Sequence, residues 1–143
     1  MAKVILHSIG KALEKALDPA EAAKNAAHLA RLEAALDDKR EEVRAGWGEK
    51  YIDRVHAKGK LTTRERIDLL KDDGTDIHPV GSLVNYGLTF GPDDKTSPGA
   101  GVVTAFVRVA GRITMVIAND NTVASGSWWP RTPEKIQRAQ EMA

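Results

Sequence analysis

The stretch VVTAFVRVAGRITMVIA, residues 102–118, decides the fold because it predicts two strands joined by a tight turn. β-branched and apolar residues dominate residues 102–109 and 112–118. The Ala110-Gly111 pair between them suits a two-residue hairpin, although Ala-Gly is a weaker turn signal than Asn-Gly. The second strand is almost continuously apolar, so we expect both of its faces to be buried inside a sheet that helices cover.

A loop and a helix follow the predicted hairpin. Residues 119–130 read NDNTVASGSWWP and contain several turn-forming residues. Thr132, Pro133 and Glu134 then predict a helix start, with Thr132 as the cap and proline in the first turn. The sequence stops within this helix without a glycine or a capping residue. Because three candidate strands are also few for a layered domain, we expect the sequence to be truncated.

The segment before the hairpin contains a helix with a recognisable start. Thr62 and Glu65 have the Thr-x-x-Glu spacing of a capping box, and Gly74 can close this helix in the left-handed conformation. Residues 77–84 predict a short strand, which an internal proline weakens. Residues 87–100 are rich in proline, glycine and aspartate and predict an exposed loop.

The beginning of the chain predicts helices. Residues 3–17 have helical apolar spacing, and Asp18 and Pro19 supply the cap and the first position of a second helix. Residues 20–45 carry an apolar residue every seven positions, before a Gly-Trp-Gly break at residues 46–48 and a further short helix. This long helix is either a docking arm for another subunit, which we favour, or a helix that folds back on its own domain.

Composition excludes several classes of function. The chain has 143 residues and a formal net charge of +1, so its bulk charge favours neither nucleic acid nor an anionic membrane. It has no cysteine, which excludes disulfides, thiolate metal sites and a cysteine nucleophile. No segment approaches the roughly 20 apolar residues of a membrane span. We expect a soluble, cytoplasmic protein with no nucleic-acid partner and no membrane span.

The four histidines predict no metal site. His7, His28, His56 and His78 are scattered, and no pair has the spacing of metal ligands. A nucleophile elbow, a Walker loop, an HExxH motif and a Rossmann fingerprint are also missing. The sequence therefore predicts no self-contained catalytic centre of a familiar kind.

Two segments could bind a ligand. Residues 58–67 concentrate four cations, which could meet the phosphates of a nucleotide or could form the solvated face of a helix. Residues 119–130 lead into a helix whose first amide groups can hold an anion, and Gly126 permits close approach of the backbone. Alternatively, Asp120 and Asn121 serve only as turn residues while the two tryptophans pack the helix on the sheet. Physical arguments alone favour neither of these two interpretations of the loop.

Several motifs, in order along the chain, resemble one enzyme family. Residues 58–70 (KGKLTTRERIDLL), 99–104 (GAGVVT) and 118–123 (ANDNTV) are similar to segments of the carboxyltransferase β subunits of biotin-dependent acyl-CoA carboxylases. The pattern from Ser125 to the RAQE sequence at residues 138–141 resembles the methylcrotonyl-CoA carboxylase branch. Ser125 replaces a frequent glycine and tryptophans replace the usual tyrosines, which leaves the acyl specificity open. The glutaconyl-CoA decarboxylase α subunit is a related branch.

The resemblance implies a fold, a cofactor and partners. The expected fold is the N-terminal part of a crotonase-like α/β carboxyltransferase domain at residues 58–143, preceded by a helical arm at residues 1–57. The implied cofactor is biotin carried by a biotin carboxylase or biotin carrier subunit, and the implied substrate is a CoA thioester with an unsaturated or branched acyl group. The remainder of the subunit and further copies of it are the other implied partners.

The resemblance also locates the site. The backbone N–H groups that stabilise the enolate are expected beyond Ala143, so this portion alone should be inactive. The alternatives are a glutaconyl-CoA-type decarboxylase subunit and a non-catalytic assembly module. The residues expected to line the acyl-CoA site are Thr122, Val123, Ser125, Gly126 and Ser127, with Arg64 and Arg66 as weaker candidates for the CoA phosphates.

Overall fold

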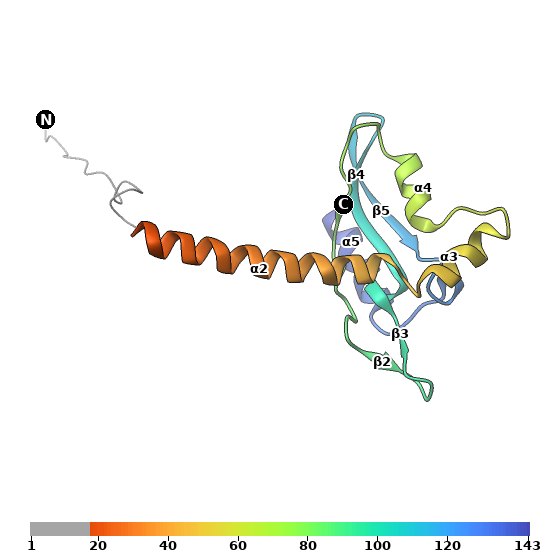
Figure 1. The fold of residues 1–143 in the computed structure, drawn as a ribbon. Coiled ribbons are helices and arrows are strands. Elements are labelled where there is room, and N and C mark those ends of the chain that lie inside the picture. The colour runs from red at the N-terminus through yellow and green to blue at the C-terminus, as the bar shows by residue number, and fades with distance from the viewer. Residues whose placement is uncertain (1–17) are drawn as a thin grey trace, which may run out of the picture. The chain divides into compact units, whose positions relative to one another are not determined.

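The computed structural model describes residues 18–143, which are coloured in Figure 1. The predicted helix at residues 3–17 and His7 lie outside the described residues. The described residues divide into two units, residues 18–38 and residues 39–143. Within residues 18–143, no helix is both long enough and apolar enough to cross a membrane.

Helix α2 (Pro19–Arg44) begins where the sequence predicts. The Asp18 carboxylate accepts a hydrogen bond from Ala20 N at 3.1 Å, which satisfies one of the unpaired amide groups at the start of a helix. The helix ends before Gly46, which has a φ of +58°, and α3 (Glu49–His56) follows. The predicted break between two helices is therefore confirmed.

Helix α4 (Thr63–Leu70) begins with the predicted capping box. Thr62 Oγ1 accepts a hydrogen bond from Glu65 N at 3.3 Å, and Glu65 Oε2 accepts one from Thr62 N at 2.6 Å. Two amide groups are thus satisfied by side chains a few residues away, which is why the sequence alone locates this helix start.

The end of α4 differs from the prediction that Gly74 closes the helix. The helix ends at Leu70, and Gly74 belongs to a later turn, where its φ is +71°. The chain leaves the helical path because Asp72 N donates a hydrogen bond to Arg108 O of the sheet at 2.8 Å. A tertiary contact, rather than a local glycine signal, ends this helix.

The larger sheet has three antiparallel strands in the order β1-β4-β5, namely β1 (His78–Pro79), β4 (Val102–Val109) and β5 (Arg112–Asn119). Both predicted strands of the hairpin are confirmed. Ala110 and Gly111 have φ values of +49° and +78°, as in the two-residue turns typical of hairpins. The predicted strand at residues 77–84 is reduced to β1. Val80 N still donates to Thr104 O at 2.8 Å, but the chain turns away at Gly81, which has a φ of +62°.

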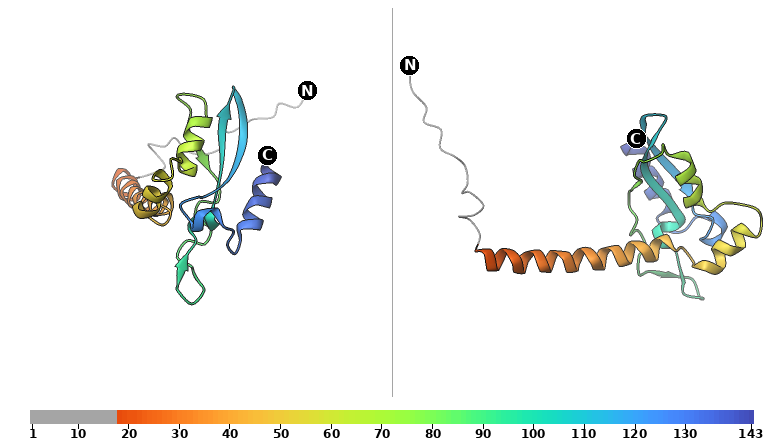
Figure 2. Two further views of the ribbon diagram at one scale, coloured as in Figure 1. Left: turned by 90° about the vertical axis from the view of Figure 1, so that its right-hand side faces the viewer. Right: turned by 45° about the horizontal axis from the view of Figure 1, so that its top comes forward.

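Two helices cover opposite faces of the β4–β5 hairpin, as the left view of Figure 2 shows. On one face, Ile67 of α4 packs against Val103, Ala105 and Val107, which alternate along β4. On the other face lies α5 (Thr132–Met142), with Lys135 and Ala139 buried. The buried central strand therefore lies between two helical layers.

Strand β5 is more exposed than its sequence predicts. Among the described residues it pairs only with β4 and forms an edge of the sheet. Ile113 is 72% exposed and Ile117 is 36% exposed. The prediction that both faces of this strand are buried is wrong for this chain. An apolar run reports a preference for burial, but burial also requires a neighbouring element to cover the strand.

The predicted exposed loop at residues 87–100 contains more structure than expected. The short strands β2 (Thr89–Phe90) and β3 (Lys95–Thr96) form a separate antiparallel ribbon. Trp47 Nε1 donates a hydrogen bond to Thr96 O at 2.9 Å and ties this ribbon to the α2–α3 junction. The prediction is wrong for the end of the segment, because Ser97, Gly99 and Ala100 are buried.

Helix α5 begins at Thr132 as predicted, but Thr132 is not its cap. The cap position belongs to Arg131, which has a left-handed φ of +68° and makes no capping hydrogen bond with its side chain. Thr132 Oγ1 instead accepts a hydrogen bond from Trp129 N at 2.8 Å and donates one to Ala100 O at 2.6 Å. The hydroxyl fastens the preceding loop to the segment before β4.

Candidate functional site

The loop after β5, residues 119–130, is fastened to the start of α4. Thr63 N donates a hydrogen bond to Asn121 Oδ1 at 2.9 Å, and Asn121 N donates one to Thr63 Oγ1 at 3.1 Å. Asn121 Nδ2 also donates to Leu61 O at 3.0 Å. The two segments that the sequence offers as separate ligand candidates therefore form one structure.

Asp120 is the buried centre of this loop, with only 3% of its surface exposed. Its Oδ1 accepts hydrogen bonds from Thr122 N at 3.0 Å and from Thr122 Oγ1 at 2.6 Å. Its own backbone N donates to Gly101 O at 2.9 Å. The carboxylate thus holds a local turn in the manner typical of aspartate, and the Thr122 hydroxyl points to the interior.

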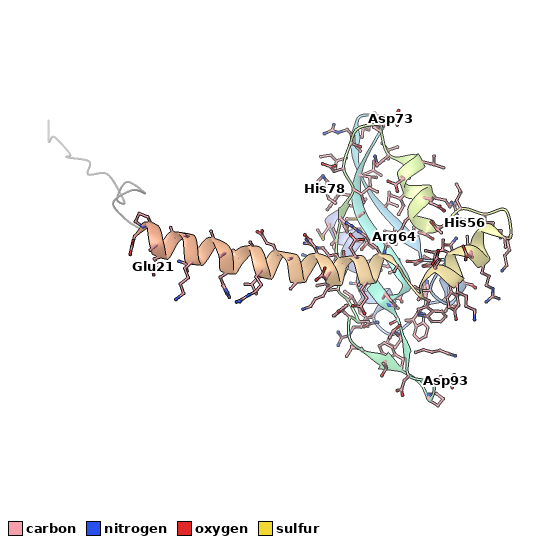
Figure 3. The ribbon with its side chains drawn as sticks, viewed as in Figure 1. Glu21, His56, Arg64, Asp73, His78 and Asp93 are labelled. Carbon is pink, nitrogen blue, oxygen red and sulfur yellow. The ribbon has the colours of Figure 1, made fainter. Side chains whose placement is uncertain are left out.

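Arg64, which is labelled in Figure 3, contacts both this loop and the end of α2. Its Nε donates to Arg44 O at 3.1 Å and its Nη2 donates to Val43 O at 3.3 Å. Nη2 also lies 3.9 Å from Asp120 Oδ2. Desolvation lowers the pKa of Arg64, and the Asp120 carboxylate opposes that shift. The guanidinium therefore satisfies the Arg44 carbonyl group at the end of α2 and adds a second donor to Val43 O, which also accepts from Gly46 N at 3.2 Å.

The predicted site residues of the loop divide into buried and exposed ones. Val123 and Thr122 are buried, whereas Ser125 and Ser127 are exposed. Ser127 Oγ donates to Ala124 O at 2.8 Å, but the Ser125 hydroxyl has no hydrogen bond to any described residue. Ser125 and the half-buried Gly126 have φ values of +58° and +87°, in the left-handed region, and Ser125 is exposed at this turn.

The remaining cation that the sequence predicts near the site, Arg66, is exposed. The two tryptophans of the loop differ in their exposure. Trp128 is 62% exposed, whereas the ring of Trp129 lies 5.9 Å from that of Trp47 and 6.0 Å from that of Phe90. Trp129 therefore packs the loop against the α2–α3 junction and the β2–β3 ribbon.

Lys135 is a buried cation close to the site that the sequence does not single out. It is 7% exposed, and its Nζ donates to Gly99 O at 2.8 Å and to Val102 O at 2.7 Å. Burial, followed by the nearby Arg64 charge, lowers the pKa of Lys135 to about 8. A lysine on an amphipathic helix ordinarily faces water, so no pattern in the sequence indicates this burial.

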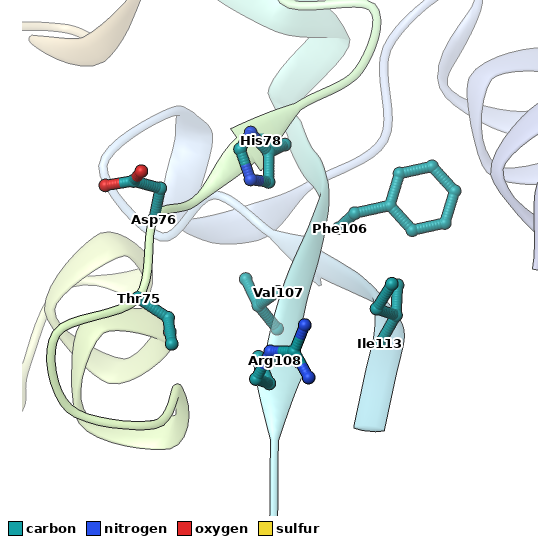
Figure 4. Close-up of a pocket in the computed structure, with 7 residues that line it drawn as sticks. All are labelled: Thr75, Asp76, His78, Phe106, Val107, Arg108 and Ile113. Atoms are coloured by element: carbon teal, nitrogen blue, oxygen red, sulfur yellow. The ribbon is translucent and has the colours of Figure 1, made fainter. Parts of the chain in front are cut away.

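A separate pocket lies toward the hairpin turn, where Thr75, Asp76 and His78 face residues of β4 and β5 (Figure 4). Ile113 lines this pocket and lies six positions before Asn119, where the loop starts, a span of about 20 Å along the strand. The pocket is therefore a different region from the loop. The sequence does not predict it, because its lining comes from three segments.

Within residues 18–143, no group of three or more His, Asp or Glu side chains could hold a metal ion. His56 instead contacts Glu65, with Nε2 lying 2.9 Å from Oε2. This contact, followed by the hydrogen bonds from Thr62, lowers the pKa of Glu65 to about 2. His56 therefore supports the capping box at the start of α4.

The interlocked motifs, the hairpin and the flanking helices define a known class. Residues 54–143 match the carboxyl transferase domain, and the chain belongs to this family. It is 40% identical over 124 residues to the probable mitochondrial methylcrotonoyl-CoA carboxylase beta chain of Drosophila melanogaster, an alignment that covers 87% of this chain and 21% of that protein. It is 37% identical to the methylmalonyl-CoA decarboxylase subunit alpha of Veillonella parvula, over 76% of this chain and 21% of that one.

A solved structure supports the fold. The transcarboxylase 12S structure, described as a hexamer with hydrolysed methylmalonyl-coenzyme A bound, matches 76% of this chain and 21% of its own chain, with a TM-score of 0.68 and 32% identity. The predicted crotonase-like α/β carboxyltransferase fold is confirmed by this match. The chain spans about a fifth of the length of each of these relatives.

Proposed function

We propose that this chain forms part of a biotin-dependent carboxyltransferase that moves a carboxyl group between carboxybiotin and an acyl-CoA. The observation that carries the proposal is the clamp between Thr63 and Asn121, which lies inside the family match. It fixes the loop in which the exposed Ser125 and Ser127 follow the buried Thr122 and Val123. The relatives named above support the proposal, since their names refer to CoA thioesters.

In this proposal the loop forms one wall of the acyl-CoA site. Residues 125–127 face the ligand, and Thr122 and Val123 support them from the buried side. The exposed Arg66 is a cation that can meet a CoA phosphate. Biotin is carried by a partner biotin carboxylase or carrier subunit. The proposal names no described residue as a contact of biotin. The remainder of the subunit supplies the N–H donors that stabilise the enolate.

The acyl group and the direction of transfer are further parts of the proposal. Similarity to a methylcrotonoyl-CoA carboxylase beta chain favours an unsaturated or branched acyl-CoA in the carboxylating direction. Similarity to a decarboxylase subunit alpha favours a second candidate, a decarboxylase. We also propose that residues 1–57 form an arm that contacts another subunit. Assembly with further copies of the subunit and a cytoplasmic location are further parts of the proposal.

The test uses the full-length subunit assembled with its biotin-carrying partner. Carboxylation and decarboxylation are measured against methylcrotonyl-, geranyl-, glutaconyl-, propionyl- and methylmalonyl-CoA. We expect transfer that requires biotin, with the highest kcat/KM on an unsaturated or branched acyl-CoA. Activity on propionyl-CoA alone would refute the proposed acyl preference. An assembled complex that transfers no carboxyl group to or from any of these thioesters would favour a non-catalytic assembly module.

A further inference from the structure

Arg64 joins three segments that are far apart in the sequence. Its guanidinium donates hydrogen bonds to Val43 O and Arg44 O at the end of α2, and Nη2 lies 3.9 Å from the Asp120 carboxylate. The planar fork of arginine directs its donors to the two carbonyl groups and places its charge beside the carboxylate, whereas lysine offers a single compact ammonium group. The side chain is therefore occupied by internal partners.

The contacts continue from Asp120 into the loop. The other oxygen of this carboxylate accepts both hydrogen bonds from Thr122. The Thr122 side chain in turn packs against the backbone of Gly46, so closely that a Cβ at Gly46 would overlap Thr122 Oγ1. The loop is thus held at two points to the same α2–α3 junction, by Arg64 through Asp120 and by direct packing of Thr122.

We propose that Arg64 is a positioning residue that sets the place of the Thr122 to Ser127 turn, and that it does not bind the CoA phosphates. The inference rests on the proposed function, in which this turn lines the acyl-CoA site. Removing the guanidinium takes away the cation beside Asp120 Oδ2 and the side-chain donor to Arg44 O and Val43 O in a partly buried place. Asp120 Oδ1 keeps its donors from Thr122, and Val43 O keeps the donor from Gly46 N. The turn then loses its fixed position while the exposed Ser125 and Arg66 remain.

The first measurement separates positioning from phosphate binding. The full-length complex is assayed with R64M, R64K and the matched control R54M, which alters an exposed arginine of α3. Each is given an acyl-CoA and the corresponding acyl-pantetheine, which lacks every phosphate. We expect R64M and R64K to lower kcat/KM about tenfold on both substrates, the effect of losing one charge-assisted hydrogen bond, and R54M to change neither. A loss seen with acyl-CoA but absent with acyl-pantetheine would overturn the proposal.

The second measurement does not depend on activity. Amide hydrogen exchange of Thr122 and Gly126 is compared with that of Ala105 in the core of β4. We expect R64M and R64K to speed exchange at the turn about tenfold while Ala105 keeps its protection. Unchanged exchange at the turn refutes positioning. If R64M does not fold, R64K supplies the measurement. A wild-type complex without carboxyl transfer would contradict the proposed function but leave the exchange result intact.

Discussion

Asp72 accepts a hydrogen bond from Gly111 N at 2.7 Å across 39 positions of sequence, and its other oxygen accepts one from Ala110 N at the same distance. One carboxylate thus satisfies both amide groups of the hairpin turn. This explains how Ala-Gly, a weak turn signal, holds a tight turn here.

We expect Asp72→Ala to destabilise the hairpin, because both turn amides lose a charged acceptor. The free energy of unfolding should fall by about 1–2 kcal/mol, less than for a fully buried contact. Urea unfolding measures the change. The neighbouring Asp73→Ala is the matched control, since Asp73 is exposed. Equal losses in the two variants would show that the turn does not depend on the Asp72 carboxylate.

We expect Asn121→Ala to destabilise the clamp between α4 and the loop. It removes the acceptor of Thr63 N and the donor to Leu61 O. The loss in free energy of unfolding should be about 1–3 kcal/mol, the cost of leaving a buried amide unpaired. Chemical denaturation of Asn119→Ala provides the comparison, because that side chain is exposed. A variant as stable as the control would contradict the structural role of the clamp.

If the Ser125 hydroxyl contacts the acyl-CoA, Ser125→Ala should raise KM for acyl-CoA about 3- to 10-fold in the assembled enzyme, the effect of one lost hydrogen bond. Its stability should be unchanged, since the hydroxyl bonds to no described residue. Steady-state kinetics and thermal unfolding are measured on the same samples. Thr89→Ala, at an exposed residue of β2, is the control. An unaltered KM would exclude the Ser125 hydroxyl as a ligand contact.

Lys135 predicts a pH dependence of stability in the alkaline range. Its pKa is about 8 in the folded chain against an ordinary 10.5, so folding is penalised while the amine is protonated. Between these values the unfolded chain holds a proton that the folded chain has released. Stability should therefore rise from pH 8 to 10.5, by at most about 3 kcal/mol.

The measurement compares unfolding free energies of the wild type, Lys135→Met and Lys60→Met across this range. The gain with pH should be absent in Lys135→Met and present in Lys60→Met, because Lys60 is exposed. A wild-type curve parallel to that of Lys135→Met would show that the buried amine is not titrating as proposed.

Glu65 predicts a pH dependence of stability in the acid range. Here the charged form of the side chain stabilises the fold, whereas the charged form of Lys135 destabilises it. Its pKa is about 2 in the folded chain and ordinarily 4.5, so the ionised form stabilises the fold. That contribution is complete above pH 4.5 and is lost as the pH falls toward 2. Glu65→Gln should therefore be less stable than the wild type at pH 7, and the two should converge near pH 2. Thermal unfolding checks this, with Glu33→Gln as an exposed control; a constant gap would exclude the ionised carboxylate as the cause.

Parts of the fold that depend on near neighbours were predictable. The cap at Asp18, the capping box of Thr62 and Glu65 and the two strands of the hairpin all rest on residues a few positions apart. Burial was less predictable. The apolar β5 is largely exposed, and the lysine at position 135 is buried, because burial depends on which elements lie next to a residue.

The sequence by itself determined the family, the order of the elements and the two motifs of the candidate site, since these are written in local patterns. Only the tertiary structure decided that the motifs interlock, that Arg64 faces Asp120 and the end of α2, and that Ser125 is exposed while Thr122 is not. The physical reason is that each buried donor or charge must find an acceptor wherever the packed chain offers one, at any distance along the sequence.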